Sequence, residues 1–542
     1  MAERPESGIS RRDFLIGASA TSAVAGLGGL ILLRHRRPTT SVPGQGTPVD
    51  AGAVVVGDSI AAVAAVCELQ RAGVGAVLLV PAGHVGGMTT AGLSITDIGD
   101  PTTVGGFARQ LYVDIGARYG LDHAYGFTPD VAQAVIDGYL KQGGVTVVRD
   151  APIIRLRQAG GVLQAITADG VAYRSRYVID ATYEGDVIDM AGVAFRLGRE
   201  GRAEFGEPDA GVRPPSHGDA STSPQRTPGD PASGLLAGVE PAIPVSSYGD
   251  SDGRVGAPCF RLTVTQGSRR LLWTAPAGYD PADYEITARV AAAGGNPLKN
   301  IVPIIPGGAG DADLNNYQMG STDLIAQGGR PWIDADGATR AQLFDQYRDW
   351  TQGLLYFLAT DVRVPGPIRE AANRWGLDAD QFPATGGWSP LLYVREGRRL
   401  IGRVTLTEHE VLGERPVAEP VALASYPMDS HDHRYLVDAK GRLAVEGDLS
   451  IRHPPVGIPL GALIPAEGGS GLVAAGAVST THVAWCAVRT EPVLAMIGQA
   501  AGVLVATAAR LGVAPSEVPY PPVRDALLAR GAVLAIDQHA GT

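Results

Sequence analysis

The residues best suited to chemistry in this sequence are histidines and an arginine in three short stretches. His482 lies in "STTHVAW", His431 and His433 lie in "MDSHDH", and Arg395 lies in "YVREGRRLIG". An imidazole exchanges protons near neutral pH, and a guanidinium holds a carboxylate or carbonyl oxygen through two hydrogen bonds. These residue types predict a site that binds an oxygen-bearing small molecule and moves a proton.

Each of these residues also has an ordinary structural interpretation. A histidine at a helix entrance, such as His482, can be satisfied by backbone groups, and His431 can belong to a hydrogen-bonded loop. If their stretch is extended, His431 and His433 share one face. Arg395 can form surface or interdomain salt bridges, with Glu396 and Glu408 as partners, instead of contacting a substrate.

Neither the histidines nor the cysteines form a metal motif. The mixed His and Asp residues of "MDSHDH" are not followed by a further ligand cluster, so we expect no bound metal. Cys67, Cys259 and Cys486 are far apart and odd in number, which argues against a disulfide framework. We expect all three to be small buried side chains.

Length and charge narrow the class of protein. The chain has 542 residues, enough for two or three domains, and its formal net charge is −11. An acidic surface argues against binding to nucleic acid or to an anionic membrane. The 72 glycines and 39 prolines predict many turns and close backbone approaches rather than a helical bundle.

A β-α-β unit opens the folded part of the chain. "AVVVG" predicts a buried strand, residues 60–69 a helix ending near Gly73, and "VGAVLLV" a second strand ending at Val80. The unit has the length that a right-handed parallel crossover needs. Further strands are expected in "GVTVVRD", "IIRLRQ", "GVLQAITAD" and "RYVIDAT", helices over 340–358 and 493–510, and a surface excursion over 206–256.

The turn of this unit resembles a degenerate dinucleotide loop. The three glycine positions of such a loop hold Gly57, Ser59 and Ala62, whose small side chains nearly meet the same geometric demands. A helix N-terminus would still face the phosphates. The charge of Asp58 would oppose them unless the side chain points away, and Val80-Pro81 replaces the ribose-binding acid at the end of the second strand.

Three later segments are also rich in small residues and could bring backbone close to a flat cofactor. The first, "HVGGMTTAGLS", follows the second strand, the second is "VIDATYEGD", and the third runs from "GLVAAGAVSTTH" to "GQAAG". Their candidate contact residues are His84, Gly86, Gly87, Met88, Thr89, Ala181, Thr182, Gly476, Gly498, Gln499 and Gly502.

Through "HVGGMT", "DATYEGD" and "GQAAG" the chain resembles a bacterial branch of the FAD-dependent oxidoreductases of glutathione-reductase-type fold, over about residues 53–537. The resemblance implies an α/β fold. It comprises a Rossmann-like FAD-binding domain, with a parallel sheet, helices and a β-meander, and an inserted mixed α+β substrate domain. The missing ribose acid departs from the family pattern, as does Leu460-Gly461, where relatives often carry an aromatic-Arg pair.

The family also implies a reaction and a set of site residues. A small organic substrate would give hydride to flavin N5, and the electrons would pass to O₂ or a carrier. The small residues of the loop and of the three segments would bind FAD, with a covalent link through His84 as one possibility. The expected catalytic residues are His482, His431, Arg395 and Tyr183. Arg489 and Glu491 are expected to form a buried pair that supports their loop.

The resemblance divides the chain into four parts. We expect a signal or anchor with its linker at 1–48, FAD-binding segments at 53–195 and 438–519, a substrate or cap domain at 196–437, and a C-terminal extension at 520–542. Arg11-Arg12 ahead of an Ala/Gly-rich apolar run resembles a twin-arginine export signal, cleaved or kept as a membrane anchor. The protein is then expected outside the cytoplasmic membrane.

Two other functions fit the same sequence. A flavin-dependent isomerase or hydratase would need FAD but no electron acceptor. A non-catalytic binding protein on a decayed FAD fold would account for the imperfect glycine loop and would retain no flavin.

Overall fold

The computed structural model describes residues 47–216, 222–304, 310–315 and 319–536. The expected export signal therefore lies outside the described residues. The expected strands and helices form close to their predicted positions, because the buried apolar runs of the sequence become the core strands and the core helix α13.

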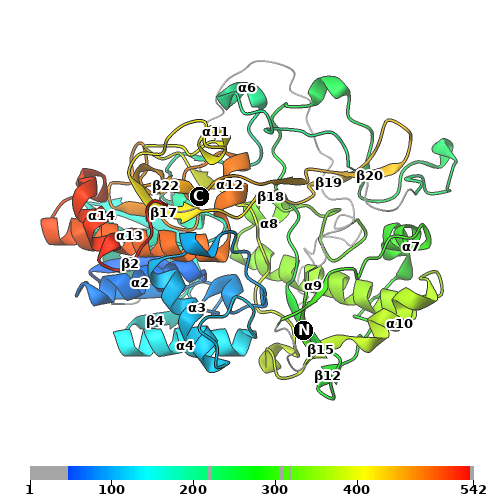
Figure 1. The fold of residues 1–542 in the computed structure, drawn as a ribbon, viewed down its shortest axis with the longest axis horizontal. Coiled ribbons are helices and arrows are strands. Elements are labelled where there is room, and N and C mark those ends of the chain that lie inside the picture. Colours follow the sequence, from blue (N-terminus) through cyan, green and yellow to red (C-terminus); the bar gives the residue numbers. More distant parts are fainter. Residues whose placement is uncertain (1–46, 217–221, 305–309, 316–318, 537–542) are drawn as a thin grey trace, which may run out of the picture.

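A five-stranded parallel sheet forms the centre of the first half of the molecule, which lies on the left in Figure 1. Its strands are parallel, and all except the edge strand Thr146–Arg149 are fully buried, as alternating strands and helices predict. In order across the sheet they are β23 (Leu472–Ala474), β8 (Val178–Asp180), β2 (Ala53–Val56), β3 (Ala76–Val80) and β4 (Thr146–Arg149).

Helix α2 (Ile60–Arg71) lies between β2 and β3 in the chain, and α13 (Glu491–Leu511) packs along it (Figure 1). A Cβ at Gly498 would lie 2.7 Å from the Ala61 carbonyl carbon, and one at Gly502 would lie 2.6 Å from the Ala65 carbonyl oxygen. Glycine at these two positions therefore permits backbone-to-backbone packing. Helix α13 is also long and apolar enough to cross a membrane, but 94% of its most apolar window is buried in the protein.

The remaining elements of this half cover the sheet and its edge. A four-stranded sheet combines three strands that follow β4 in the chain with one that precedes β2, and α14 packs on α13 at the C-terminal end. These elements are α3 (Gly106–Arg118), α4 (Pro129–Gly143), β1 (Val49–Asp50), β5 (Ile153–Ala159), β6 (Val162–Thr167), β7 (Ala172–Ser175), α5 (Asp186–Met190) and α14 (Tyr520–Leu528).

The second half, on the right in Figure 1, has its own five-stranded sheet and core. The sheet order is β12 (Arg270–Leu271), β15 (Gly376–Asp378), β11 (Leu262–Thr265), β14 (Asp311–Leu314) and β13 (Ile301–Pro303). Its helices are α7 (Glu285–Ala292), α8 (Arg330–Asp334), α9 (Gly337–Thr360) and α10 (Gly366–Arg374).

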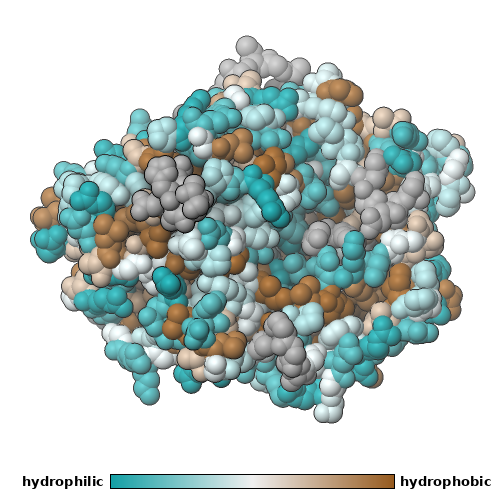
Figure 2. Space-filling view, in the orientation of Figure 1, coloured by the Kyte–Doolittle hydropathy of each residue, from teal (hydrophilic) through white to brown (hydrophobic). Residues whose placement is uncertain are grey.

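Short strand pairs, a small sheet and short helices make up the other described strands and α-helices. The pairs are β9 (Phe195–Arg196) with β16 (Arg399–Leu400), β17 (Pro420–Ala424) with β22 (Val456–Pro459), and β18 (Met428–Ser430) with β21 (Leu449–Ile451). The three-stranded sheet contains β10 (Val239–Glu240), β19 (Arg434–Val437) and β20 (Leu443–Glu446). The short helices are α6 (Arg202–Phe205), α11 (Glu408–Val411) and α12 (His482–Val488). Figure 2 shows hydrophilic and hydrophobic residues interspersed over one face of the molecule.

Candidate functional site

The turn between β2 and α2 is held against the end of β8. Gly57 has a φ of 146°, and a Cβ there would lie 2.9 Å from the backbone nitrogen of Thr182, so glycine is required. The Ser59 hydroxyl donates to the Ala181 carbonyl at 2.6 Å and caps α2 by accepting from the Ala62 N–H. The expected loop residues Gly57, Ser59 and Ala62 thus meet Ala181 and Thr182 in space.

The first turn of α2 has the donors that an anion needs. The backbone N–H groups of Ile60 and Ala61 are fully buried and have no acceptor among the described residues. Buried unpaired N–H groups at a helix N-terminus form an anion-binding site, in which the helix dipole also favours negative charge. This observation fits the pyrophosphate of a dinucleotide.

Asp58 does not oppose an anion there. Its Oδ1 turns to the end of β3 and accepts from the Ala82 N–H at 2.9 Å. Burial raises the pKa of Asp58 to about 8, so the carboxyl is protonated and uncharged at neutral pH. The side chain therefore reaches the strand end where the sequence lacks the ribose-binding acid.

The Gly86-Gly87 loop lies over the start of α2. A Cβ at Gly87 would lie 2.8 Å from the Ser59 Cα. Next to it, the Thr89 N–H and hydroxyl both donate to Glu491 at 3.1 and 2.7 Å, and the Tyr183 hydroxyl donates to the other Glu491 oxygen at 2.8 Å. The Tyr183 oxygen in turn accepts from the Met88 N–H. One buried carboxyl thus joins the three expected cofactor segments.

Several other expected cofactor residues contact protein in this structure. A Cβ at Gly476 would lie 2.9 Å from the Ala181 carbonyl carbon, so Gly476 allows β23 and β8 to continue side by side. Gln499 accepts from the Phe107 N–H and donates to Glu68. Together with Gly498 and Gly502 on α13, these two residues position the elements around α2.

His84 is directed at its own loop. Its Nε2 lies 2.9 Å from the Thr90 hydroxyl and 3.1 Å from the Thr90 carbonyl oxygen. Burial lowers the pKa of His84 to about 4, so the ring is neutral at pH 7. Gly86, with a φ of 105°, makes the turn that places this ring beside Thr90.

His431 and Arg395 share a partner that the sequence did not identify. His431 Nδ1 lies 2.9 Å from Asp323, and Arg395 donates to the same carboxylate at 3.1 Å. Burial opposes ionisation of Asp323, but Arg395 and His431 outweigh it and lower its pKa. His431 Nε2 lies 3.5 Å from Asp429, so the imidazole is between two carboxylates. The expected salt bridge of Arg395 with Glu396 is wrong.

His431 and His433 do not face one side of a strand. Both lie in the connection between β18 and β19, and His433 turns to Glu396 with a separation of 3.5 Å. His482, the first residue of α12, also approaches Glu396, at 3.0 Å from Nε2, rather than a backbone group.

The expected pair of Arg489 and Glu491 is also not formed. Arg489 bonds to Asp429 at 2.6 Å and to the Tyr393 hydroxyl at 2.9 Å, while Glu491 holds Thr89 and Tyr183. The two side chains support different segments because Arg489 caps the end of α12 while Glu491 begins α13. Cys259 and Cys486 are buried as expected, and Cys67 is partly buried.

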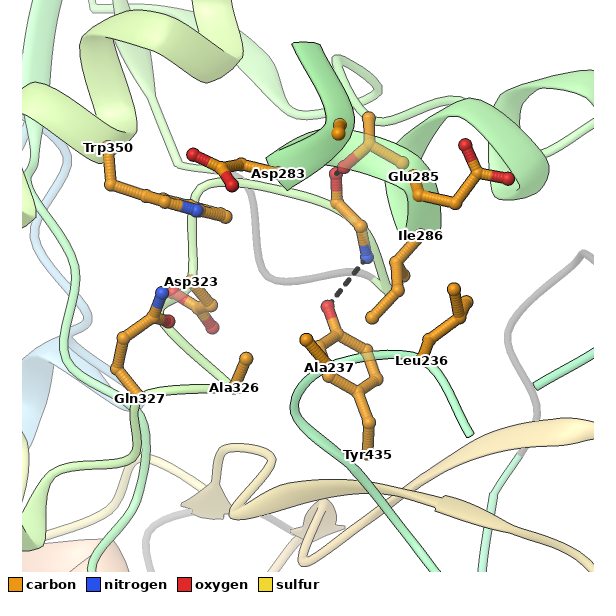
Figure 3. A pocket seen from close by; sticks show the side chains of 13 residues that line it. Leu236, Ala237, Asp283, Glu285, Ile286, Asp323, Ala326, Gln327, Trp350 and Tyr435 are labelled. Carbon is orange, nitrogen blue, oxygen red and sulfur yellow. Dashed lines mark hydrogen bonds between the residues drawn. The ribbon is translucent and has the colours of Figure 1, made fainter. Parts of the chain in front are cut away.

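A cavity of about 140 Å³ lies in the second half of the molecule (Figure 3). Leu236, Ile286 and Ala326 give it apolar walls, and Asp323 lines it as well. Two lining side chains have buried polar atoms without a partner among the described residues, namely the amide of Gln327 and the indole Nε1–H of Trp350. Apolar walls with a few convergent polar groups are typical of a small-molecule site.

Comparisons with known proteins address the family. The model of the family described as "FAD dependent oxidoreductase" matches residues 53–527. No curated protein sequence matches the chain. Solved structures that it resembles include a bacillithiol disulfide reductase from Staphylococcus aureus, at 13% identity and a TM-score of 0.19, over 25% of this chain and 38% of that one.

A flavin-containing monooxygenase from Stenotrophomonas maltophilia is similar at 18% identity and a TM-score of 0.20, over 29% of this chain and 44% of that one. The chain thus spans less than half the length of either structure. The family match, in contrast, covers most of the 542 residues and includes every segment of the site. The protein belongs to the FAD dependent oxidoreductase family, and it is an enzyme with FAD as its cofactor.

Proposed function

We propose that this enzyme oxidises a small organic substrate held in the second half of the molecule, and that residues 196–437 form the inserted substrate domain. The observation that carries the proposal is the double role of Asp323. It lines the cavity with Gln327 and Trp350, and it binds both His431 and Arg395. A molecule in the cavity would therefore lie beside a proton acceptor and a fixed positive charge.

The size and lining of the cavity set the substrate class. A volume of about 140 Å³ is close to that of an engineered cavity that binds benzene. The free amide of Gln327 offers both a donor and an acceptor, and the Trp350 indole offers a donor. We infer a compact, largely apolar substrate with at least one hydroxyl, carbonyl or amine group.

The chain's own residues then orient the substrate and move one proton. Gln327 and Trp350 bind its polar group, and Arg395 balances negative charge that develops on it. His431, held by Asp323 and Asp429, accepts the proton. FAD, when bound, supplies the acceptor for the substrate hydride, and O₂ or a carrier receives the electrons.

The residues at the start of α2 would hold the cofactor. The N–H groups of Ile60 and Ala61 would bind the pyrophosphate, and the Gly86-Gly87 loop would cover it, with Met88 and Thr89 fixed by Tyr183 and Glu491. His84 serves as a loop residue in this arrangement.

The test is an anaerobic titration of the purified enzyme with compact alcohols, hydroxy acids, amines and ketones while its flavin absorbance is followed. We expect one class to bleach the flavin, and O₂ or a quinone to restore it. Gln327→Leu should raise KM without changing flavin content, whereas Gln133→Leu on α4 should change neither. A substrate that turns over with no acceptor present would instead assign the enzyme to the isomerase or hydratase class.

We also propose that residues 1–48 direct export by the twin-arginine route, because Arg11-Arg12 precedes an apolar run. A reporter fused to residues 1–48 should be exported, and the double change Arg11→Lys and Arg12→Lys should block it. Export that survives this change would point to another route, with the apolar run as a membrane anchor.

A further inference from the structure

Three side chains far apart in the sequence converge, and none of them lines the cavity or belongs to the α2 turn. Glu396, His433 and His482 each offer a ligand atom, and these atoms all lie within 4.8 Å of one another. The Glu396 oxygens are 3.0 Å from His482 Nε2 and 3.5 Å from His433 Nε2. Two ligand atoms on one tetrahedral metal ion, at bonds of about 2.0–2.2 Å, are separated by about 3.4 Å. The cluster therefore has nearly the spacing of a metal site.

The cluster is buried and short of hydrogen bonds. All three residues are at most 3% exposed. Neither ring nitrogen of His433 has a hydrogen-bond partner among the described residues, and Nδ1 of His482 has none either. Buried polar atoms are normally paired, so unpaired ring nitrogens indicate a missing ligand.

The negative charge of the Glu396 carboxylate also favours the binding of a cation. Two buried acids that contact the backbone of this cluster have arginine partners, Glu446 with Arg199 and Glu200 with Arg399. The ion pairs of Glu396 within the described chain are with the two histidines alone.

The fold holds the ligands in place before any ion binds. Glu396 accepts from the Gly256 N–H at 3.0 Å, which orients its carboxylate. The His433 N–H donates to the Glu446 carbonyl at 2.8 Å, and a Cβ at Gly447 would lie 2.8 Å from His433 Cγ, so only glycine admits the ring there. His482 is fixed by its place at the start of α12, where its N–H donates to Glu200 at 2.7 Å.

We propose that Glu396, His433 and His482 bind one divalent first-row transition metal ion, such as Zn²⁺ or Fe²⁺, in a site with two histidines and one carboxylate. This donor set leaves coordination positions open, as in metal sites that bind water or a small oxygen ligand. The site is separate from the proposed substrate cavity and does not depend on the reaction proposed above.

The test measures metal in the full-length protein as purified and after incubation with Zn²⁺ followed by desalting. We expect about one ion per chain. Glu396→Gln, His433→Ala and His482→Ala should each weaken Zn²⁺ binding at least about 100-fold in a chelator competition, a loss at or above that seen for outer-sphere changes. His431→Ala, two residues from His433 and outside the cluster, should keep full occupancy.

Circular dichroism of each variant separates loss of a ligand from loss of the fold. X-ray absorption at the zinc edge of the unchanged protein gives a second readout that needs no variant, with nitrogen and oxygen ligands expected at about 2.0–2.1 Å and imidazole scattering beyond them. A folded protein that binds no Zn²⁺, Fe²⁺ or Co²⁺ at micromolar concentration would overturn the proposal. So would occupancy that persists in all three variants.

Discussion

The packing of α13 on α2 positions the anion site, so a methyl group added at that contact should weaken both stability and FAD retention. In Gly498→Ala the new Cβ would lie 2.5 Å from the Ala61 Cα and 2.7 Å from its carbonyl carbon, and both are backbone atoms. Because ordinary contacts begin near 3.4 Å, the two helices must separate by about 1 Å. Overpacking of this kind costs about 1–3 kcal/mol.

The gain in helix propensity from glycine to alanine offsets up to about 1 kcal/mol, so we expect a net loss of about 1–2 kcal/mol. Gly138→Ala on α4 is the matched control, because its Cβ would meet no atom within 4 Å. Gly138→Ala should increase the free energy of unfolding by up to about 1 kcal/mol. Denaturant unfolding followed by circular dichroism, together with flavin content, measures both variants. A Gly498→Ala protein as stable as Gly138→Ala, with full flavin content, would refute this account of the contact.

Three further predictions concern buried polar groups. Asp58→Asn should become more stable relative to the wild type as pH rises from about 4 to 8. The pKa of Asp58 is higher in the folded protein than in the unfolded chain, so the folded carboxyl holds a proton that the unfolded chain releases. The contribution of this carboxyl to the stability of the wild type therefore falls over that pH range. Thermal melts at several pH values measure the stability difference between variant and wild type, and a difference that stays constant would contradict this prediction. Tyr183→Phe should lower the free energy of unfolding by about 1–3 kcal/mol, because it leaves the Met88 N–H and one Glu491 oxygen unpaired. An unchanged unfolding midpoint would argue against a stabilising role for these two hydrogen bonds. Arg199→Met should lower the free energy of unfolding by about 3–5 kcal/mol, because the fully buried guanidinium binds both Asp252 and Glu446. A decrease below about 1 kcal/mol would show that solvent compensates the charge of these two acids.

The sequence predicted the β-α-β unit and the core helix well, because their signals are local. A buried apolar run of strand length, a serine cap and a second run define β2, α2 and β3 without any distant contact. Helix α13 was predicted as 493–510 and spans Glu491–Leu511, since its apolar residues cover every face. The glycines of α13 and Gly476 were interpreted as cofactor contacts, whereas here they admit neighbouring backbone; small residues give the same sequence signal in both cases.

The partners of the candidate catalytic residues could not be predicted from the sequence. Asp323 binds His431 and Arg395 across separations of 108 and 72 residues, and Glu396 meets His482 across 86 residues. Local pairing between the arginines and the carboxylate of "YVREGRRLIG" was one interpretation of the sequence, but Arg395 binds Asp323, Arg399 binds Glu200, and Glu396 accepts from the Gly256 N–H. A pattern such as "MDSHDH" therefore identified chemical residue types but not which of them share a site.

The charge of Asp58 could not be predicted from the sequence either. From the sequence we expected the Asp58 side chain to repel the phosphates, because an aspartate carboxyl in water is ionised at neutral pH. The structure turns it toward Ala82 and partly buries it, which raises its pKa and removes the charge. Only the local environment could decide between these two outcomes.

The central claim, FAD held at the start of α2, is tested most directly by the visible absorption spectrum of the purified protein. The spectrum is recorded again on the supernatant after acid precipitation. We expect a two-band flavin spectrum that passes entirely into the supernatant, because His84 Nε2 is engaged by Thr90 and the proposed contacts from the N–H groups of Ile60 and Ala61 would be hydrogen bonds. Colour that stays in the pellet would contradict non-covalent binding, and a colourless protein that cannot be reconstituted with FAD would contradict the site itself.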